Sequence, residues 1–367
     1  MSPGECSECS MSDPILIYGS TGYTGRLIIR ELRRRGIEPV LAGRNATRLS
    51  VLAGELGLPF RAAQLHSPAQ LDAALGGVSV VLHAAGPFSG TARPMLDACL
   101  RVNAHYLDVT GEVGAIEAVR ARDTEFRERA LMAMPGVGFD VVPSDCLAAR
   151  VAARLPGATH LRIGITGLNF ATRGSAKTLI EHAGRTVLVR RDGRLERVRP
   201  GSRVHTFDFG LGPRRTLGVS WGDVASAYYT TGIPNIEVYF EATPRLEAMV
   251  AAERWLGPLL RTAPTQVWLK AHADLLPEGP TDEERAAHEM VLVAEAEDAA
   301  GQRVSSRLRT AEAYTLTATT AAAIVERVLR GDTEGGFQTP ARVYGADFVM
   351  GLPGVSCDDA SEAGGWH

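Results

Sequence analysis

The sequence lacks several features that define common classes of protein. Cysteine is scarce, with 5 residues scattered over 367, and a chain of this length can build its core without disulfide staples. No run of about 18 apolar residues occurs, so no membrane span is expected. The N-terminus has neither the basic region nor the apolar region of a signal peptide. We therefore expect a cytoplasmic protein.

An excess of charge is also lacking. Lys+Arg 39 and Asp+Glu 42 leave a net charge of -3 without a basic or acidic block, so bulk charge implies neither nucleic acid nor an anionic membrane as a partner. A small-molecule substrate is the expected partner. Cys6 and Cys9 form a C-x-x-C pair, but no second pair stands at metal-ligand spacing. We predict no metal site and interpret residues 1–12 as a disordered leader.

What the sequence does contain, from Ile15 onward, is a regular alternation of short β-branched apolar runs with helical patterns. This alternation is typical of parallel βαβ units, and six such strands predict an α/β fold with a Rossmann-type doubly wound sheet. Its ligands bind at the carboxyl ends of the strands. Strands are predicted at 15–19, 39–42, 60–64, 78–84, 106–109 and 131–135, and helices at 25–35, 47–56, 68–75, 93–102 and 114–129.

Past Pro143 the alternation stops, and strand-like segments with Gly and Pro punctuation follow. They predict a second α+β domain on a mostly antiparallel sheet, followed by a helix over 313–330. The polar residues after 354 are expected to be disordered. We interpret the apolar segment 255–260 as a partly buried helix end, with contact to a greasy substrate or a bilayer surface as the alternative. The strands are predicted at 159–166, 201–209, 235–241, 290–297 and 303–310.

A glycine-rich loop follows the first strand and opens the first helix, the context in which such a motif predicts dinucleotide binding. Its spacing is G-x-x-G-x-x-G. Gly19 permits the tight turn, Gly22 lets the backbone approach a pyrophosphate, and Gly25 allows the helix to pack closely on the strand. The predicted cofactor-binding residues of this loop are Gly19, Ser20, Thr21, Gly22, Tyr23, Thr24 and Gly25.

The end of the second strand predicts the choice of cofactor. NAD enzymes place an acidic residue there against the ribose 2′-hydroxyl, whereas this chain has Arg44 and Asn45, with Arg44 19 positions after Gly25. An arginine can bind a 2′-phosphate, and no carboxylate repels it. We predict that NADPH is favoured over NADH.

Residues at the other strand ends are candidates for the cofactor and the substrate. Ala84, Ala85, Gly86 and Pro87 follow the fourth strand, where small residues let the backbone pass close to the ribose and nicotinamide. The histidine before them, His83, is interpreted as a hydrogen-bonded core residue.

Three carboxylates follow the later strands of the same sheet. Glu112 comes after the fifth strand, where it either complements a helix dipole or contacts substrate or ribose. Asp140 and Asp145 lie at the crossing into the second domain, where a cleft would place the substrate. Either can anchor a polar substrate group, and Ser144 or Asp145 can equally cap the following helix.

Several motifs in the right order make the chain resemble the saccharopine dehydrogenase-like family of reductases. They are IYGSTGYTGRLI, LAGRN, AAGPF, YLDVTGE, PGVGFDVVPSD and VSWGDVASAYYTTGIPNIEVY. The resemblance implies a Rossmann domain completed by C-terminal elements, formed by residues 13–145 and 312–354. Residues 146–311 would form the α+β substrate or oligomerisation domain, and residues 355–367 a disordered tail. Many such reductases pair through the second sheet, so a homodimer is an open alternative, although the sequence does not indicate the oligomeric state.

The resemblance implies an NADPH-dependent oxidoreductase of a biosynthetic pathway, and its branch includes trans-acting enoyl reductases. Reduction of a C=C bond and reduction of a C=N bond both remain open. For an enoyl substrate the proton donor would be Tyr228, Tyr229 or Lys177, and for an imine Asp145 or Glu112 would stabilise the iminium. Arg173 and Trp221 are further substrate candidates. The alternatives are a saccharopine-type amino-acid reductase or dehydrogenase, and an NADP(H)-binding sensor without catalysis.

Overall fold

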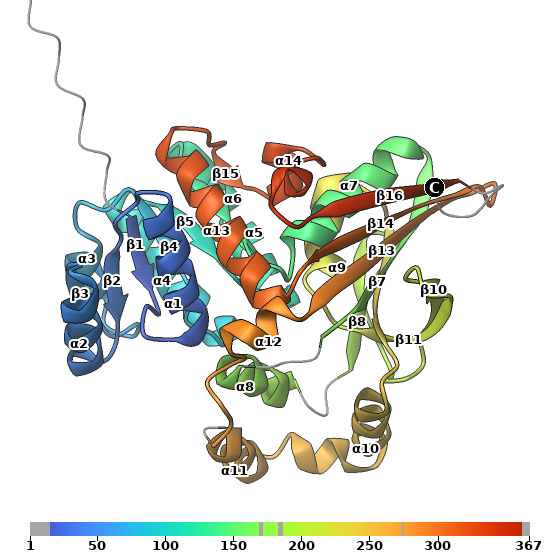
Figure 1. Ribbon diagram of the computed structural model, residues 1–367, viewed down its shortest axis with the longest axis horizontal. Helices are drawn as coiled ribbons and strands as arrows, with labels where there is room; N and C mark the ends of the chain where they lie inside the picture. Colours follow the sequence, from blue (N-terminus) through green and yellow to red (C-terminus); the bar gives the residue numbers. More distant parts are fainter. Residues whose placement is uncertain (1–14, 169–171, 183–185, 274, 362–367) are drawn as a thin grey trace, which may run out of the picture.

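The computed structural model describes residues 15–168, 172–182, 186–273 and 275–361. The Cys6 and Cys9 pair and the predicted leader lie outside these ranges. Over the described residues the strands form two sheets, which stand side by side with helix α13 between them (Figure 1). Among the described helices, none has the length and apolar character needed to cross a membrane.

The first sheet contains seven parallel strands in the order β15-β6-β5-β4-β1-β2-β3 over the described residues. The chain runs outward in one direction from β1 to β3 and in the other from β4 to β6, so the point where the strand order reverses lies between β1 and β4. This confirms the predicted doubly wound fold. The strands are β1 Ile15–Tyr18, β2 Val40–Gly43, β3 Phe60–Ala62, β4 Val80–His83, β5 His105–Asp108, β6 Met132–Met134 and β15 Gly336–Phe337.

Helices cover both faces of this sheet, which explains why its central strands are continuous apolar runs. All four residues of β1, β2 and β4 are buried. The predicted helix at 114–129 is two helices, because the chain turns after Arg120 and brings Phe126 fully into the core. The helices are α1 Tyr23–Arg34, α2 Ala46–Leu56, α3 Pro68–Leu75, α4 Phe88–Val102, α5 Val113–Arg120 and α6 Asp123–Glu128.

The C-terminal part of the chain returns to this first sheet, as the family resemblance implied. Strand β15 pairs in parallel with β6, placing Phe337 beside Ala133. Helix α13, Ala313–Leu329, packs against α1 and β4. Short helix α14, Pro340–Tyr344, and a 3-10 helix, Val349–Gly351, then pack on α7, Val142–Arg154.

The second sheet has nine strands over the described residues, with the main path β10-β11-β12-β7-β13-β14-β16 and a β8–β9 hairpin attached to β12. Of these neighbours only β12 and β7 run parallel, which confirms the predicted mostly antiparallel sheet. Its inner face packs on α7 and α9, Asp223–Thr231. The strands are β7 Ala158–Thr166, β8 Val187–Arg191, β9 Arg194–Val198, β10 Val204–Asp208, β11 Pro213–Val219, β12 Asn235–Glu241, β13 Glu289–Asp298, β14 Arg303–Ala311 and β16 Ser356–Ser361.

Strand β16 differs from the disordered tail that the sequence predicted. It pairs with β14 over Ser356–Ser361, although its residues show no apolar alternation. Ion pairs and backbone pairing hold it instead: Asp359 accepts hydrogen bonds from Arg150 at 2.6 Å and Arg154 at 3.2 Å. These partners lie about two hundred positions away, so local periodicity contains no sign of them.

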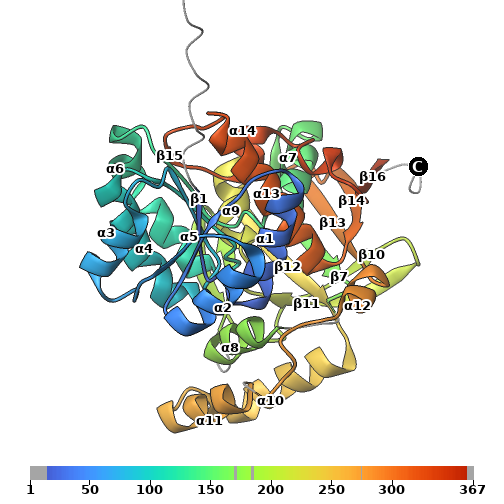
Figure 2. The ribbon, with the colours of Figure 1, turned by 60° about the vertical axis from the view of Figure 1, so that its left-hand side comes forward.

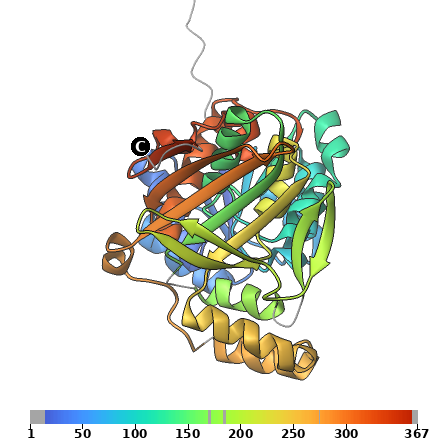
Figure 3. The ribbon, with the colours of Figure 1, turned by 90° about the vertical axis from the view of Figure 1, so that its right-hand side faces the viewer.

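Helices inserted between the strands of the second sheet extend from one end of the molecule. We call α10, Pro244–Leu260, and α11, Ala263–Ala273, the helical arm. In Figures 1, 2 and 3 the arm lies below the rest of the ribbon, next to α8, Arg173–His182. A segment with the short helix α12, Asp282–Ala286, then leads back to β13.

Candidate dinucleotide and substrate site

The glycine loop lies between β1 and α1, at the point where the strand order reverses. A Cβ atom on Gly25 would stand 2.4 Å from the Gly19 carbonyl oxygen, and one on Gly19, where φ is +100°, would stand 2.8 Å from the Ala84 carbonyl carbon. Only glycine fits at either position. Gly22 begins α1 without a side-chain cap, so the amides of the first turn face outward with their positive dipole end. This cradle fits a pyrophosphate.

The other residues of the loop divide into structural and exposed groups. Ser20 is fully buried, and its hydroxyl donates to the Ile17 carbonyl at 2.7 Å and accepts from the Ala42 amide at 3.0 Å. It therefore ties the loop to β1 and β2. Thr21 and Thr24 are partly exposed. The Tyr23 hydroxyl donates to the Pro280 carbonyl at 2.5 Å, which fastens the loop to the segment before α12.

Arg44 stands exposed at the carboxyl end of β2, as the sequence predicted. Among the described residues, no carboxylate forms an ion pair with its guanidinium, so it is available to an anionic ligand. Asn45 has a different use, because its side chain caps α2 by accepting from the Arg48 amide at 3.0 Å. The two neighbours thus place a free cation at a well-defined helix start.

Glu112 holds the start of a neighbouring helix. Its two carboxylate oxygens accept from the Phe88 amide at 2.7 Å and the Ser89 amide at 2.8 Å, in the first turn of α4. The negative charge offsets the dipole of α4. The sequence offered a helix-dipole role as one alternative for Glu112. The structure shows such a role, but at the start of α4 and not at the start of the helix that Glu112 precedes.

Two buried groups shape the loops behind these strand ends. Asp108 accepts from the Thr110 and Gly136 amides, both at 2.9 Å, and from the Tyr106 hydroxyl at 2.6 Å. Burial raises the pKa of Asp108 to about 6. His83 is fully buried beside Thr91, 3.0 Å from its hydroxyl, and burial lowers the pKa of His83 to about 3. The neutral ring agrees with its interpretation as a core histidine.

Asp140 presents a carboxylate at the carboxyl end of the sheet. It packs on Gly111, where an added Cβ would stand 2.6 Å from Oδ2. Among the described residues none donates a hydrogen bond to this carboxylate, in contrast to those of Asp108 and Glu112. Burial, and to a lesser degree the charge of Glu112, raises the pKa of Asp140 to about 7. The group can therefore exchange a proton near neutral pH.

Tyr314, which the sequence analysis missed, joins this edge from the start of α13. Its hydroxyl accepts from the Thr172 amide at 2.8 Å and lies 3.0 Å from the Ser175 hydroxyl. Its ring meets the ring of Tyr23 edge-on at 5.4 Å. Burial chiefly, with Asp140 contributing, raises the pKa of Tyr314. The position of Tyr314 at the start of a returning helix was the available signal, but only the fold brings these residues together.

Helix α8 covers the loop after β4. A Cβ on Gly86 would stand 3.8 Å from the Thr178 hydroxyl, so α8 lies over the predicted nicotinamide end. Lys177 is half-buried on this helix. Arg173 points the other way, donating to the Leu276 carbonyl and lying 3.9 Å from Glu278.

Three further predicted site residues, Tyr228, Tyr229 and Trp221, contact side chains outside the edge that carries Asp140. The Arg190 guanidinium stands 4.2 Å above the ring of Tyr228, and the Tyr229 hydroxyl donates to Glu117 at 2.7 Å. Burial, with Glu117 contributing, raises the pKa of Tyr229 to about 12. The ring of Trp221 packs against Phe240 at 4.9 Å. The structure does not bring these three side chains into contact with Asp140 or Tyr314.

Asp145 is fully buried and connects three helices. It accepts from the Thr230 hydroxyl of α9 at 2.5 Å and from the Ala341 amide of α14 at 2.9 Å. Burial raises the pKa of Asp145 to about 6. Both oxygens are thus engaged by the protein.

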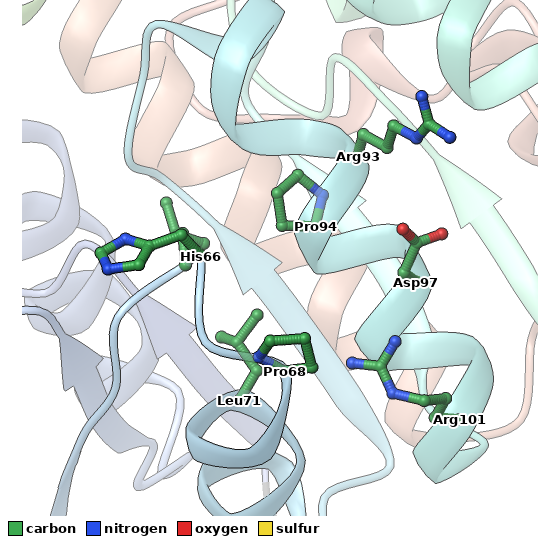
Figure 4. A pocket seen from close by; sticks show the side chains of 8 residues that line it. His66, Pro68, Leu71, Arg93, Pro94, Asp97 and Arg101 are labelled. Atoms are coloured by element: carbon green, nitrogen blue, oxygen red, sulfur yellow. The ribbon is translucent and has the colours of Figure 1, made fainter.

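A groove of about 270 Å³ lies between α3 and α4, beside the loop that follows β3 (Figure 4). Two of its charged side chains are already paired, Arg101 with Asp72 at 2.7 Å and Asp97 with Arg122. Because neither Asp140 nor Tyr314 lines it, the groove adds no second candidate for the reacting centre.

The fold and the glycine cradle define a Rossmann-type dinucleotide-binding domain. Residues 15–134 match the family model of the saccharopine dehydrogenase NADP binding domain. Over these residues the chain is therefore similar to that NADP-binding domain, and the family model agrees with the predicted choice of NADP. The match covers β1 to β6 and ends before Asp140.

Curated relatives and a solved structure extend this result. Trans-acting enoyl reductases of Mycobacterium leprae and Mycobacterium ulcerans are 32% and 30% identical over 142 residues, 36% of this chain and 33% of each relative. The chain thus matches about a third of their length. Saccharopine dehydrogenase (L-Glu forming) from Saccharomyces cerevisiae superimposes with a TM-score of 0.65 at 13% identity, covering 95% of this chain and 100% of that one. This second likeness shows a shared fold.

Proposed function

We propose that the protein is an NADPH-dependent reductase that acts on the C=C bond of an enoyl intermediate in a biosynthetic pathway. The observation that carries this proposal is the unpaired carboxyl of Asp140 at the edge of the sheet that also holds the glycine cradle. The names of the mycobacterial relatives support the enoyl substrate. Reduction of a C=N bond is the second candidate, because a carboxylate at this position also suits an iminium.

Cofactor binding is assigned to the loop and to Arg44. The amides at the start of α1 would hold the pyrophosphate, and the Arg44 guanidinium would hold the 2′-phosphate. NADPH, when bound, supplies the hydride that adds to the β-carbon of an enoyl thioester or to the carbon of an imine. Helix α8 would shield that end of the cleft from water.

Asp140 is proposed to provide the proton. In enoyl reduction its carboxyl would donate a proton to the α-carbon, leaving a carboxylate that bulk water reprotonates. In imine reduction its carboxylate would instead face the iminium nitrogen, which carries the positive charge. Tyr314, near Asp140 and held by Thr172 and Ser175, is proposed to orient the substrate carbonyl. The earlier candidates Tyr228, Tyr229 and Asp145 rank behind these two because their side chains contact Arg190, Glu117 and Thr230. Lys177, half-buried on α8, is kept as an alternative proton donor.

A saccharopine-type substrate with several carboxylates receives less support. Arg173 is bound to the 276–278 segment, and Arg285 donates to the Tyr23 hydroxyl at 2.5 Å and to Asp282 at 2.6 Å. Neither guanidinium is left free to pair with substrate carboxylates.

The test is turnover by the purified full chain. NADPH oxidation would be followed with a panel of 2-enoyl thioesters and a panel of aldehyde–amine mixtures, using wild type, Asp140→Asn and Asp192→Asn. Asp192 is an exposed turn residue and serves as the matched control. Oxidation with enoyl thioesters that is lost in Asp140→Asn alone supports the proposal. Turnover restricted to aldehyde–amine mixtures selects imine reduction, and tight NADPH binding without turnover indicates a sensor.

A further inference from the structure

The helical arm leaves large apolar side chains at the surface. Trp255 is 81% exposed and Trp268 59%. The sequence favoured a partly buried helix end at 255–260, and the structure corrects this interpretation. The polar segment that follows the arm, in contrast, contacts the glycine loop.

This segment, residues 276–286, runs from the end of the arm through α12 toward β13 (Figure 1), and we call it the strap. Very little of the strap is buried: Pro280 is, but none of the residues of α12. The strap also pairs with no strand. A segment with so little buried surface has low local stability, and such segments supply the lids that open and close over ligands. A few side-chain contacts therefore decide where the strap lies.

Tyr23, the first residue of α1, holds the middle of the strap. Its hydroxyl donates to the Pro280 carbonyl at 2.5 Å, and a Cβ on Gly279 would stand 2.7 Å from the Tyr23 ring. The Arg285 guanidinium donates to the same hydroxyl at 2.5 Å and to the Pro280 carbonyl at 3.1 Å. The side chain of Arg285 is 9% exposed, against 69% for the neighbouring Asp282. Tyr23 and Arg285 thus form a clasp around the Pro280 carbonyl.

The strap is fastened to both walls of the candidate site. On one side Tyr23 opens α1, whose first amides are assigned to the pyrophosphate, and Arg30 of the same helix pairs with Asp282 at 3.0 Å. On the other side Arg173, the first residue of α8, donates to the Leu276 carbonyl. Helix α8 covers the predicted nicotinamide end. A segment fastened to both walls stands in the path of a dinucleotide that enters or leaves.

We propose that the strap is a gate for NADPH, and that Arg285 is the positioning residue that holds the gate closed through Tyr23. The inference rests on the proposed function, because it needs NADPH to bind at the glycine cradle. Opening breaks the hydrogen bonds of the clasp and moves polar groups into water, so it exposes little apolar surface. The same opening precedes both entry and release of the cofactor. The clasp therefore limits both rates.

The test is the exchange of NADPH by the full chain, followed in stopped flow by the fluorescence of the bound cofactor. Arg285→Gln breaks the clasp from the strap, and Tyr23→Phe removes only a hydroxyl. In both variants the association and dissociation rate constants should rise together by at least about fivefold, with Kd within about twofold of wild type. Arg35→Gln is the matched control, since Arg35 joins α1 to Glu326 of α13 at 2.9 Å and not to the strap.

Hydrogen exchange over residues 276–286 gives a second measurement, and it should be faster in Arg285→Gln than in wild type or Arg35→Gln. Circular dichroism and thermal unfolding establish that the variants fold. Tyr23→Phe, which keeps the ring, decides the test if Arg285→Gln does not fold.

Rates that rise together at a nearly constant Kd support the gate. Three results overturn it: unchanged rates, an equal change in Arg35→Gln, or a rise in the dissociation rate alone, which would make the clasp a cofactor ligand. Wild type that does not bind NADPH overturns the proposed function as well. Wild type that binds NADPH at rates indifferent to the clasp overturns the gate alone.

Discussion

The Thr317 hydroxyl accepts a hydrogen bond from the Phe139 amide at 3.0 Å, across 178 positions of sequence. Thr320, one turn later in α13, donates to the Val137 carbonyl at 2.9 Å. A Cβ on Gly138 would stand 2.9 Å from Thr317 Cγ2, so the loop and the helix are in close contact. The C-terminal helix thus positions the loop that carries Asp140.

Replacing Thr317 with valine is therefore expected to affect both stability and activity. The shape is kept, but the buried Phe139 amide loses its acceptor, which costs about 2 kcal/mol of unfolding free energy. We expect kcat to fall and its pH profile to shift, because the Asp140 loop loosens. Urea denaturation and pH-dependent kinetics measure the two effects. Thr319→Val, which removes only a bond within α13, should leave the pH profile unchanged.

Asp140→Asn should remove the pH dependence of the reaction above neutrality. Because burial raises the pKa of Asp140 to about 7, a reaction that needs its acid form slows as the pH rises through 7. The asparagine variant cannot donate this proton, so kcat should fall about a hundredfold or more and lose that limb of the profile. An unchanged limb in Asp140→Asn would assign the proton to another group.

The same shift of the Asp140 pKa predicts a pH-dependent stability difference. The folded state binds the Asp140 proton more tightly than the unfolded state does, so this contribution to stability is complete below about pH 4 and is lost as the pH rises through 7. Asparagine has no proton to lose. In thermal unfolding, the stability of Asp140→Asn relative to wild type should therefore increase between pH 4 and pH 8. A stability difference that stays constant with pH would contradict the raised pKa.

Arg44→Asp should reverse the cofactor preference. A guanidinium bound to a phosphate contributes about 2 kcal/mol, and the introduced carboxylate repels the 2′-phosphate, so the ratio of kcat/KM for NADPH to that for NADH should fall at least about thirtyfold. Kinetics with both cofactors measure the ratio. Arg34→Ala, in the last turn of α1, is the control. Retention of the NADPH preference in Arg44→Asp would show that another group binds the phosphate.

Gly25→Ala should impair dinucleotide binding. The added Cβ would stand 2.4 Å from the Gly19 carbonyl oxygen, so the cradle must open. We expect the Kd for NADPH, measured by calorimetry, to rise at least about tenfold. Gly54→Ala in α2 meets no atom within 4 Å and should bind normally, with a gain in stability of about 0.5–1 kcal/mol. Equal affinity of the two variants would contradict the assignment of the cradle.

Glu112→Ala should destabilise the protein by about 3 kcal/mol, because two amides of α4 lose a charged acceptor in a buried place. Denaturant unfolding measures this loss, and Glu55→Ala on the exposed face of α2 is the control. Glu112→Gln keeps one acceptor and should lose less. Since the charge of Glu112 helps to raise the pKa of Asp140, the glutamine variant should also shift the pH profile of kcat downward.

Local pattern was enough to predict much of the dinucleotide domain. Gly19, Gly22 and Gly25 follow a buried strand and open a helix, and that order predicts the cradle because each glycine answers a local steric need. Arg44 was predicted from its place at the end of β2, since parallel strands bring their carboxyl ends to one edge of the sheet. The strand order follows from short right-handed crossovers.

The catalytic candidates depended on contacts that no local pattern contains. Tyr228 and Tyr229 carry suitable chemistry, yet packing turns them toward Arg190 and Glu117. Tyr314 lies at the candidate site because α13 returns to the first sheet and its Tyr314 hydroxyl accepts from the Thr172 amide, in the segment before α8. The Asp140 carboxylate accepts no hydrogen bond from the described residues, because the segments around it bury it without placing a hydrogen-bond donor beside it.

The sequence by itself therefore determined the Rossmann sheet and the glycine cradle, and it predicted Arg44 as the cation that selects NADP, because each depends on residue type and spacing within the βαβ units. Only the tertiary structure decided that Asp140 and Tyr314 share an edge, that β16 completes the second sheet, and that Trp255 and Trp268 face outward. These outcomes rest on packing and ion pairs between segments far apart in the chain. The periodicity of a sequence indicates only which residues lie on one face of a helix or strand. Which other segments that face contacts depends on the tertiary structure.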